Sequence, residues 1–193
     1  MVTSFIMKWL MRAYLRREHE LKVKFDRSLS FQDAMFDRWE RADRLGFATG
    51  ASIYNSALVY GDVKVGADTW IGPNTLLDGG GGGISIGSSC AISAGTQIYT
   101  HHNVNRFLSG GRFPAYKGPV KIGDNCFVSS QTIIDPNVEI GDCCLVAANS
   151  FVNRSFGSHA IIAGTPAKLI GRVEVLDDNV MLHYQRHSNI KEL

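Results

Sequence analysis

The hydrophobic pattern of this chain repeats every six residues over most of its length. A period of six fits neither the α-helix, with about 3.6 residues per turn, nor the strand, with about 2. It fits a short strand followed by a tight corner, and three such units close one turn of a parallel β-helix. The pattern therefore predicts a mainly β chain that is coiled from about residue 51 to residue 152. The branched apolar residues that would fill the coil are Ile53, Val59, Val65, Ile71, Leu77, Ile86, Ile92, Ile98, Ile122, Val128, Ile134, Ile140, Val146 and Val152.

A second position, four residues after each branched one, is small or β-branched except at His102 and Phe156. Such residues suit the corners of the coil, where there is little room. Three of the four cysteines, Cys90, Cys126 and Cys144, occupy this position. The spacing therefore indicates packing rather than redox or metal chemistry for them, in a reducing compartment.

Helices are predicted on the N-terminal side of the coil. Residues 3–20 carry apolar and basic side chains at helical spacing, which indicates an amphipathic helix. Its apolar stripe either packs on the protein or a second copy, which we favour, or lies on an anionic membrane surface. A second helix is predicted from Ser30, with Asp33 completing a capping box, to Gly46. Weak apolar marks favour a terminal helix in the tail 174–193.

Two interruptions break the repeat. Between Leu77 and Ile86 there are three extra residues and a run of glycine, 79–83, which permits a bulge or a close backbone approach. Between Ile98 and Ile122 the chain leaves the coil near Thr100 and returns near Pro119. Long excursions from a rigid scaffold usually carry function. We therefore expect a helical region over 1–48, the coil over 49–172 with a functional loop over 100–119, and a tail over 173–193.

The composition narrows the classes of function. With 193 residues and 45% hydrophobic content, the chain is long enough for one domain with a substantial core. A net charge of +2 does not point to nucleic acid as a partner. Lys8 and Arg12 interrupt the first apolar residues, and no small-residue cleavage site follows, so we expect no signal peptide. The expected location is therefore cytoplasmic. If the first helix touches a membrane, we expect it to touch the inner face.

Four stretches together resemble a known family: the repeats, Thr100-His101-His102-Asn103, Ile122-Gly123-Asp124-Asn125 and Gly164-Thr165-Pro166-Ala167-Lys168. The chain is similar to the hexapeptide-repeat acyltransferases, and most closely to the galactoside, maltose and bacterial polysaccharide O-acetyltransferases, over roughly residues 51–172. The resemblance implies a left-handed β-helix, a homotrimer with active sites in the grooves between subunits, acetyl-CoA as acyl donor, and a role in polysaccharide biosynthesis.

Acetyl transfer from a thioester to a hydroxyl needs a base, and an imidazole titrates in the suitable range. His101 matches the family position directly after the loop threonine, so the resemblance implies that it is the general base and that the acceptor attacks the thioester directly. His102 is the alternative base or a substrate contact. The resemblance, together with the preference of cations for phosphate, assigns the donor coenzyme to Ser130, Ala148, Asn153, Arg154 and Lys168. The acceptor candidates are Asp78, His102 and Arg112, with Tyr116 beside them.

Two other classes stay open at this point. A zinc-dependent carbonic anhydrase of the same fold needs three histidines that converge from neighbouring turns and adjacent subunits. Only His101 and His102 of the six histidines (the others are His19, His159, His183 and His187) lie in or beside the repeat, and they are adjacent, so we expect no metal. A non-catalytic trimeric scaffold is the other alternative, although a scaffold has no need of a long histidine-led loop. The sequence leaves open the acceptor, O- or N-acetylation, the acyl length and the role of the N-terminal helices.

Overall fold

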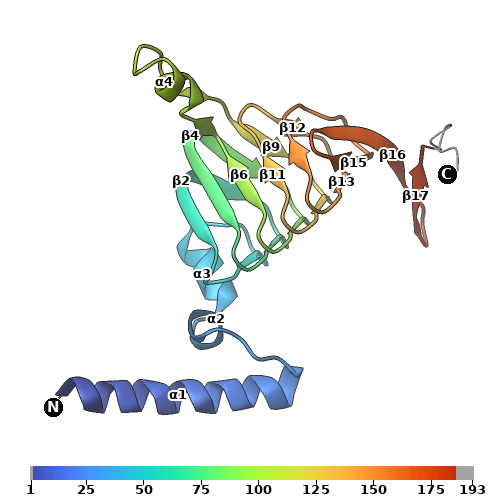
Figure 1. Ribbon diagram of the computed structural model, residues 1–193. Helices are drawn as coiled ribbons and strands as arrows, with labels where there is room; N and C mark the ends of the chain where they lie inside the picture. The colour runs from blue at the N-terminus through green and yellow to red at the C-terminus, as the bar shows by residue number, and fades with distance from the viewer. Residues whose placement is uncertain (1, 186–193) are drawn as a thin grey trace, which may run out of the picture.

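The six-residue repeat forms a three-sided parallel coil in the computed structural model, which describes residues 2–185 (Figure 1). The first side is a ladder of short parallel strands, one from each turn of the coil. Its members are β1 (Ser52–Ile53), β3 (Trp70–Ile71), β5 (Ala91–Ile92), β10 (Phe127–Val128), β13 (Leu145–Val146) and β15 (Ala160–Gly164).

The second and third sides share two long strands, β2 (Leu58–Val65) and β4 (Leu76–Ile86), which bend from one side to the next. Their first halves join the second side, and the second half of β4 joins the third. The second side continues with β6 (Gln97–Tyr99), β11 (Ile133–Ile134) and β14 (Phe151–Val152). The third side continues with β9 (Val120–Ile122) and β12 (Glu139–Ile140).

Three columns of corners join these sides, and we name them here. Corner A joins the first side to the second and comprises residues 54–57, 72–75, 93–96, 129–132 and 147–150. Corner B joins the second to the third and comprises 78–83, 100–119, 135–138 and 153–155. Corner C joins the third to the first and comprises 66–69, 87–90, 123–126, 141–144 and 157–159.

The branched apolar residues fill the inside of the coil, as predicted. All of them are buried except Val59, which is partly buried and packs on the same core. Because each residue stacks on its counterpart in the next turn at roughly 4.8 Å, the core is continuous along the coil axis. Removing one member leaves a hole lined by both neighbours.

The small residues at the corners fit the narrow space there, and their side chains also donate hydrogen bonds to backbone carbonyl groups. At corner A, the hydroxyl of Thr75 donates to the Gly72 carbonyl at 2.7 Å, and that of Ser150 donates to the Ala147 carbonyl at 2.7 Å. At corner C, the thiols of Cys90 and Cys126 donate to the carbonyls of Gly123 and Gly141, each at 3.1 Å. The prediction that the three repeat cysteines are corner packing residues is confirmed, since all three are buried and free.

The N-terminal region holds three helices where the sequence analysis expected two. Helix α1 (Val2–Phe25) runs beyond the predicted end at residue 20, and the helix predicted from Ser30 is interrupted. It is split into α2 (Phe31–Met35) and α3 (Arg38–Arg44) because Asp37 caps a new helix, accepting from the amides of Trp39 at 2.8 Å and Glu40 at 3.0 Å. None of the helices within residues 2–185 is long and apolar enough to cross a membrane.

The expected capping box at Ser30 was wrong. The Ser30 hydroxyl donates to Asp33 Oδ2 at 3.1 Å instead of accepting from the backbone, and it makes no cap hydrogen bond. The other oxygen of Asp33 accepts from the amide of Ser56 at 2.9 Å. Asp33 therefore ties α2 to the first turn of the coil, a long-range contact that a local capping pattern does not reveal.

The predicted C-terminal helix was also wrong over the described part of the tail. Strand β16 (Ala167–Val175) pairs antiparallel with β15, and β17 (Val180–Tyr184) pairs antiparallel with β16. The last turn of a coil leaves the backbone groups of β15 unpaired, and an added strand satisfies them. Residues 186–193 of the predicted tail, with His187, lie outside the described residues.

Candidate active site

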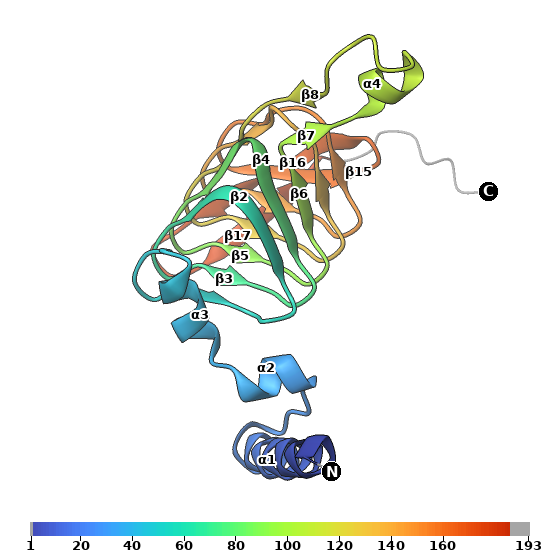
Figure 2. The ribbon, with the colours of Figure 1, turned by 90° about the vertical axis from the view of Figure 1, so that its left-hand side faces the viewer.

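The long excursion leaves the coil at corner B as a two-stranded stem (Figure 2). Strand β7 (His101–His102) pairs antiparallel with β8 (Tyr116–Lys117), so that His101 lies opposite Lys117 and His102 opposite Tyr116. Helix α4 (Val104–Leu108) lies at the far end. The stem thus holds both histidines at its base, where the chain leaves the coil.

The glycine run of β4 lies directly against this base. A Cβ on Gly81 would stand 2.1 Å from the Thr100 carbonyl oxygen, and one on Gly79 would stand 2.1 Å from the Asp62 carbonyl oxygen. The backbones of three successive turns therefore approach too closely for a side chain at these two positions, which accounts for Gly79 and Gly81. The Gly81 amide donates to Thr100 Oγ1 at 2.8 Å, and that hydroxyl donates to the Asp78 carbonyl at 2.6 Å. These bonds fix the residue that precedes His101.

A small hollow of about 300 Å³ opens at corner B beside the stem. Its lining joins residues of three coil turns to the first residues of the excursion. Asp78, Tyr99 and Asp135 each follow a buried branched residue by one position, so they stack along the corner. The residues that line the hollow are Asp78, Tyr99, His101, His102, Asn103 and Asp135.

His101 is held with its two ring nitrogens in different surroundings. Nδ1 is buried without a hydrogen-bond partner among the described residues and lies 3.7 Å from Asp78 Oδ2. The Asp78 side chain is only 17% exposed, and its Oδ1 accepts from the Gly80 amide at 3.1 Å. With Nδ1 turned to the carboxylate, Nε2 is the nitrogen left for a ligand. An imidazole backed by a carboxylate is the arrangement that general-base chemistry uses.

The acceptor candidates are only partly brought together. His102 lines the hollow, and its ring stacks on Tyr116 with centroids 5.0 Å apart. Asp78 lines the hollow as well, but its carboxylate lies next to the His101 ring, so it contacts the predicted base and not only the space for an acceptor. Arg112 does not line it: this exposed side chain donates from Nε to the Ser109 carbonyl at 3.0 Å, farther along the excursion.

The donor candidates lie at two different corners of the coil. Ser130 and Ala148 stack one above the other at corner A, where the Asn149 amide donates to the Ser130 carbonyl at 3.1 Å. Lys168 lies on β16 in the closing hairpin, which Thr165 Oγ1 ties to the Asn149 carbonyl at 3.1 Å, so it belongs to the same corner.

The remaining two donor candidates follow β14 at corner B. Asn153 and Arg154 are exposed, and the Arg154 guanidinium lies 5.2 Å from the centre of the Phe156 ring. None of the five donor candidates lines the hollow that contains His101. One chain therefore does not collect its predicted donor and base residues in a single cavity.

Sequence reasoning gave no site role to three residues of the hollow: Asn103, which follows the two histidines, and Tyr99 and Asp135 on the coil. Tyr99 and Asp135 could have been predicted, because they occupy the same position of the repeat as Asp78, directly after a buried branched residue. The Tyr99 hydroxyl donates to Gln97 Oε1 at 2.7 Å. Nothing in the residue types themselves marks this column, which holds aspartate, tyrosine, aspartate and asparagine in successive turns.

The described residues offer no metal site. Within residues 2–185, no group of three or more histidine, cysteine, aspartate or glutamate side chains is arranged to hold a metal ion.

Comparisons with known proteins agree with the repeat. Residues 119–154 match the family described as bacterial transferase hexapeptide (six repeats), and residues 62–100 match the hexapeptide repeat of succinyl-transferase. Serine acetyltransferase 4 of Arabidopsis thaliana is 36% identical over 59% of this chain and 31% of its own length, so the chain spans about a third of that relative. A Dictyostelium discoideum protein that is named as an acetyltransferase is 31% identical over 75% of this chain and 79% of its own length.

A solved structure shares the fold. The hexapeptide-repeat acetyltransferase of Vibrio cholerae, crystallised with acetyl coenzyme A, superposes with a TM-score of 0.63 at 24% identity, covering 83% of this chain and 87% of its own. The coil, both repeat matches and a relative that is aligned over most of its length agree: the chain belongs to the hexapeptide-repeat acyltransferase family.

Proposed function

We propose that this protein is an acetyl-CoA-dependent O-acetyltransferase that acetylates a hydroxyl of a sugar or polysaccharide unit. The observation that carries the proposal is the pair of His101 and Asp78 in the hollow at corner B, with Nδ1 turned to the carboxylate at 3.7 Å. Family membership supports the acyl transfer, and the acetyl-CoA bound to the Vibrio cholerae protein supports the donor. The sugar acceptor rests on the resemblance of the loop and closing strip to the sugar O-acetyltransferases.

In this proposal the acceptor reacts directly with the thioester. Nε2 of His101 takes the proton of the acceptor hydroxyl as its oxygen attacks the acetyl carbonyl carbon. The tetrahedral intermediate then breaks its carbon–sulfur bond, and the proton passes from the imidazolium to the departing thiolate of coenzyme A. Asp78 stabilises the imidazolium that forms in between, because an opposite charge within about 4 Å favours the protonated ring.

The site is proposed to form between subunits of a homotrimer of left-handed coils. Corner A, with Ser130, Ala148 and Lys168, lies a full side of the coil away from His101. Its outward flanks are apolar, since Phe127 is 49% exposed and Ile133 is 37% exposed. Burying that surface against corner B of a neighbour would bring donor residues of one copy to the base of another, with Asn153 and Arg154 beside it.

In that arrangement, the cations Arg154 and Lys168 bind the phosphates of the coenzyme, and Ser130, Ala148 and Asn153 line its pantetheine arm. Arg112 is proposed to contact the acceptor from the excursion, and His102 to support the acceptor beside the hollow. We propose cytoplasmic placement for the enzyme, since the donor is a cytoplasmic metabolite.

The sequence favours packing of the N-terminal helix, but its aromatic side chains remain exposed on the described chain, so the alternative is proposed here: the helix touches an anionic membrane. Phe5 and Trp9 are 74% and 61% exposed, and they share a helical face with Arg12 and Arg16. Aromatic side chains and long basic side chains, whose apolar stems can lie along lipid while the charge reaches water, are both favoured at a membrane interface. Flotation with anionic liposomes at low salt, where surface attraction is strongest, is the test; absence of the protein from the floating fraction would refute the contact.

The function is tested by thiol release from acetyl-CoA across a panel of sugar acceptors, with wild type and His101→Ala measured side by side. We expect acceptor-dependent release that falls by at least about 10²-fold in the variant, the lower end of general-base contributions. Lys64→Gln, a change of an exposed side chain on the third side of the coil, is the control. No release with any acceptor, together with no binding of coenzyme A, would refute the enzyme and favour a trimeric scaffold.

A further inference from the structure

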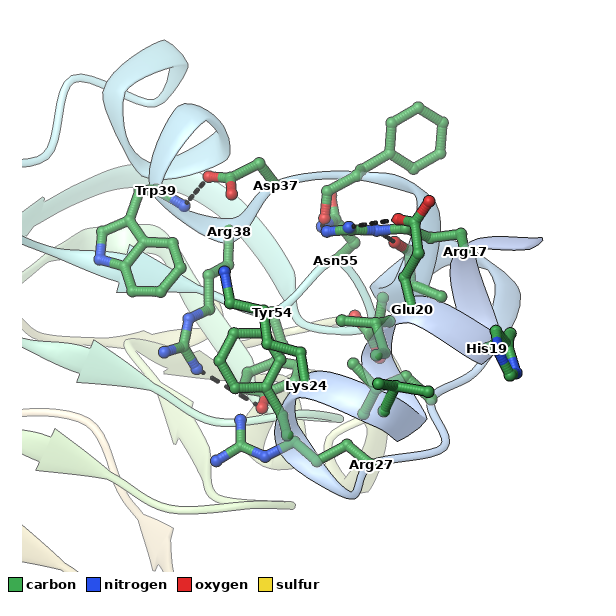
Figure 3. Close-up of a pocket in the computed structure, with 17 residues that line it drawn as sticks. Arg17, His19, Glu20, Lys24, Arg27, Asp37, Arg38, Trp39, Tyr54 and Asn55 are labelled. Carbon is green, nitrogen blue, oxygen red and sulfur yellow. Dashed lines mark hydrogen bonds and ion pairs between the residues drawn. The ribbon is translucent and has the colours of Figure 1, made fainter. Parts of the chain in front are cut away.

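A second cavity of the described chain is larger than the hollow at corner B. It measures about 700 Å³ and lies between α1, α2, the start of α3 and the first corner of the coil (Figure 3). Its walls include the side chains of Phe25, Phe36, Trp39 and Tyr54. This volume falls in the usual range for small-molecule sites, and the proposed acetyl transfer does not use it.

The acidic side chains of this cavity already have partners in the protein. Glu20 pairs with Arg17 at 3.2 Å. Asp33 accepts from Ser56 and Ser30, and Asp37 caps α3. These carboxylates are therefore engaged in holding the helices to the coil and to each other.

Three cations of the same cavity have no such partner. Lys24, Arg27 and Arg38 line it, and none of them has a carboxylate within 4.0 Å among residues 2–185. Figure 3 shows that they come from different walls, with Lys24 on α1, Arg27 just after it and Arg38 at the start of α3. Four cations of the lining (Arg17, Lys24, Arg27 and Arg38) face three carboxylates (Glu20, Asp33 and Asp37), so the cavity carries a small excess of positive charge beside an aromatic lining.

Arg38 is the most constrained of the three. Its guanidinium lies 4.1 Å from the centre of the Trp39 ring and 5.5 Å from that of Tyr54. Its Nε is buried without a hydrogen-bond partner among residues 2–185, and Nη1 reaches the Tyr54 hydroxyl only at 3.5 Å. A buried donor without an acceptor is costly, so a ligand that supplies two anionic oxygens to the guanidinium would be bound strongly.

We propose that this cavity binds an organic phosphate, in which one or two phosphoryl groups are joined to a flat or apolar body. The three cations hold the phosphoryl oxygens, since a guanidinium fork matches phosphate geometry. The aromatic walls hold the body. The chemistry is shared by a soluble nucleotide and by a lipid phosphate, and the experiment separates these two sources.

Binding is measured on the full chain through the fluorescence of Trp39, after Trp9 and Trp70 are changed to Phe. The probes are uridine diphosphate, a short-chain phosphatidic acid below its micelle concentration, and inorganic pyrophosphate. We expect saturable quenching by one of the two organic phosphates and at least tenfold weaker binding of pyrophosphate, which lacks the body. Quenching by the nucleotide identifies a soluble source, and quenching by the lipid identifies a membrane source.

Two variants and one matched control complete the test. Arg38→Gln and Lys24→Gln are each expected to weaken binding, Arg38→Gln by about 10- to 100-fold, as for the loss of a hydrogen bond to a charged group. Lys24 is exposed and makes no side-chain hydrogen bond in the described chain, so its replacement does not threaten folding. Lys22→Gln removes the same charge from α1 outside the cavity and is expected to leave affinity unchanged.

The proposal is overturned by absence of binding of either organic phosphate at millimolar concentration. If Lys22→Gln weakened binding as much as Lys24→Gln does, the proposal would also be overturned, because the ligand would then be attracted to the basic helix as a whole and not to the cavity. Pyrophosphate binding as tightly as the organic phosphates would reject the apolar component. Binding is also measured with His101→Ala, because His101 does not line the cavity. Organic phosphate binding should be unchanged in this variant even if acetyl transfer is lost, so the two proposals can fail independently.

Discussion

Replacing Gly81 with alanine tests how the coil positions His101. The added Cβ would stand 2.1 Å from the Thr100 carbonyl oxygen and 2.7 Å from His101 Cβ. Neither atom can rotate away, because both belong to the backbone or are attached directly to it. The Thr100 amide is itself bonded to the Asp78 carbonyl at 3.0 Å. The methyl group is therefore accommodated only if the base of the excursion moves outward by about 1 Å, enough to restore ordinary contact.

That displacement has unequal consequences for rate and stability. Moving His101 by about 1 Å relative to its carboxylate and acceptor costs on the order of 10²-fold in rate, as for other misplaced catalytic groups. Overpacking at one site costs about 1–3 kcal/mol in the free energy of unfolding. A coil with a continuous core withstands such a loss, since domains typically hold about 5–15 kcal/mol. Gly81→Ala should thus be folded and nearly inactive.

The assay compares the kcat of acetyl transfer and the urea midpoint of Gly81→Ala with those of two other glycine variants. Gly157→Ala meets no atom within 4 Å and should match wild type in both. In Gly80→Ala the nearest atom is Asp78 Oδ1 at 3.2 Å, at the end of a side chain that can adjust, so only a small loss is expected. Wild-type kcat in Gly81→Ala, or an equal loss in Gly80→Ala, would refute the role given to this close approach.

Three further predictions concern the site, the thiols and the core. Asp78→Asn should lower kcat by about 10- to 100-fold with little change in the acceptor KM, part of the ~10²–10⁴ of general-base catalysis; a rise in KM alone would make Asp78 an acceptor contact instead. Cys143 should be the one thiol among four that a disulfide reagent modifies in the native chain, because Cys90, Cys126 and Cys144 are buried. Burial and the neighbouring Asp142 raise the pKa of Cys143, so its thiolate fraction is low at pH 7 and its labelling rate should climb as the pH rises; a rate independent of pH would contradict this. Ile98→Ala should cost about 2–5 kcal/mol in urea unfolding and Leu182→Ala clearly less, since Ile98 is fully buried and Leu182, on β17 outside the coil, is 44% exposed; equal costs would contradict the assignment of the inside of the coil.

The inside of the coil was predictable because its chemistry is uniform. Each side of a turn buries one branched residue at the same phase of the repeat, so residue type and position carry the same information. The corners were predictable in part. At most corners the residue before the small one has a positive φ, as at Asp68, Asn74 and Asn125. Asparagine and aspartate tolerate that conformation best, and this signal was present in the sequence but was not used.

The helices were harder to predict, because their ends depend on contacts across the chain. The Ser30 pattern looked local, yet the carboxylate of Asp33 is engaged by Ser56 on the coil. The tail shows the same limit. Its weak apolar marks fit a helix or a strand, and the unpaired backbone of β15 decides for a strand. Neither partner is visible from the segment alone.

The two interruptions of the repeat, which are separate in sequence, form one structure at corner B. The extra residues of β4 make a bulge after Asp78, and the excursion begins one turn above it at Thr100. A regular turn would place a side chain at residue 81, where the Thr100 carbonyl now lies. The glycine run therefore makes the room that allows the stem to leave the coil, and the stem then brings His101 to Asp78. Since a rigid repeat offers the same surface at every turn, a unique site requires a break in two neighbouring turns at once, and the chain supplies both.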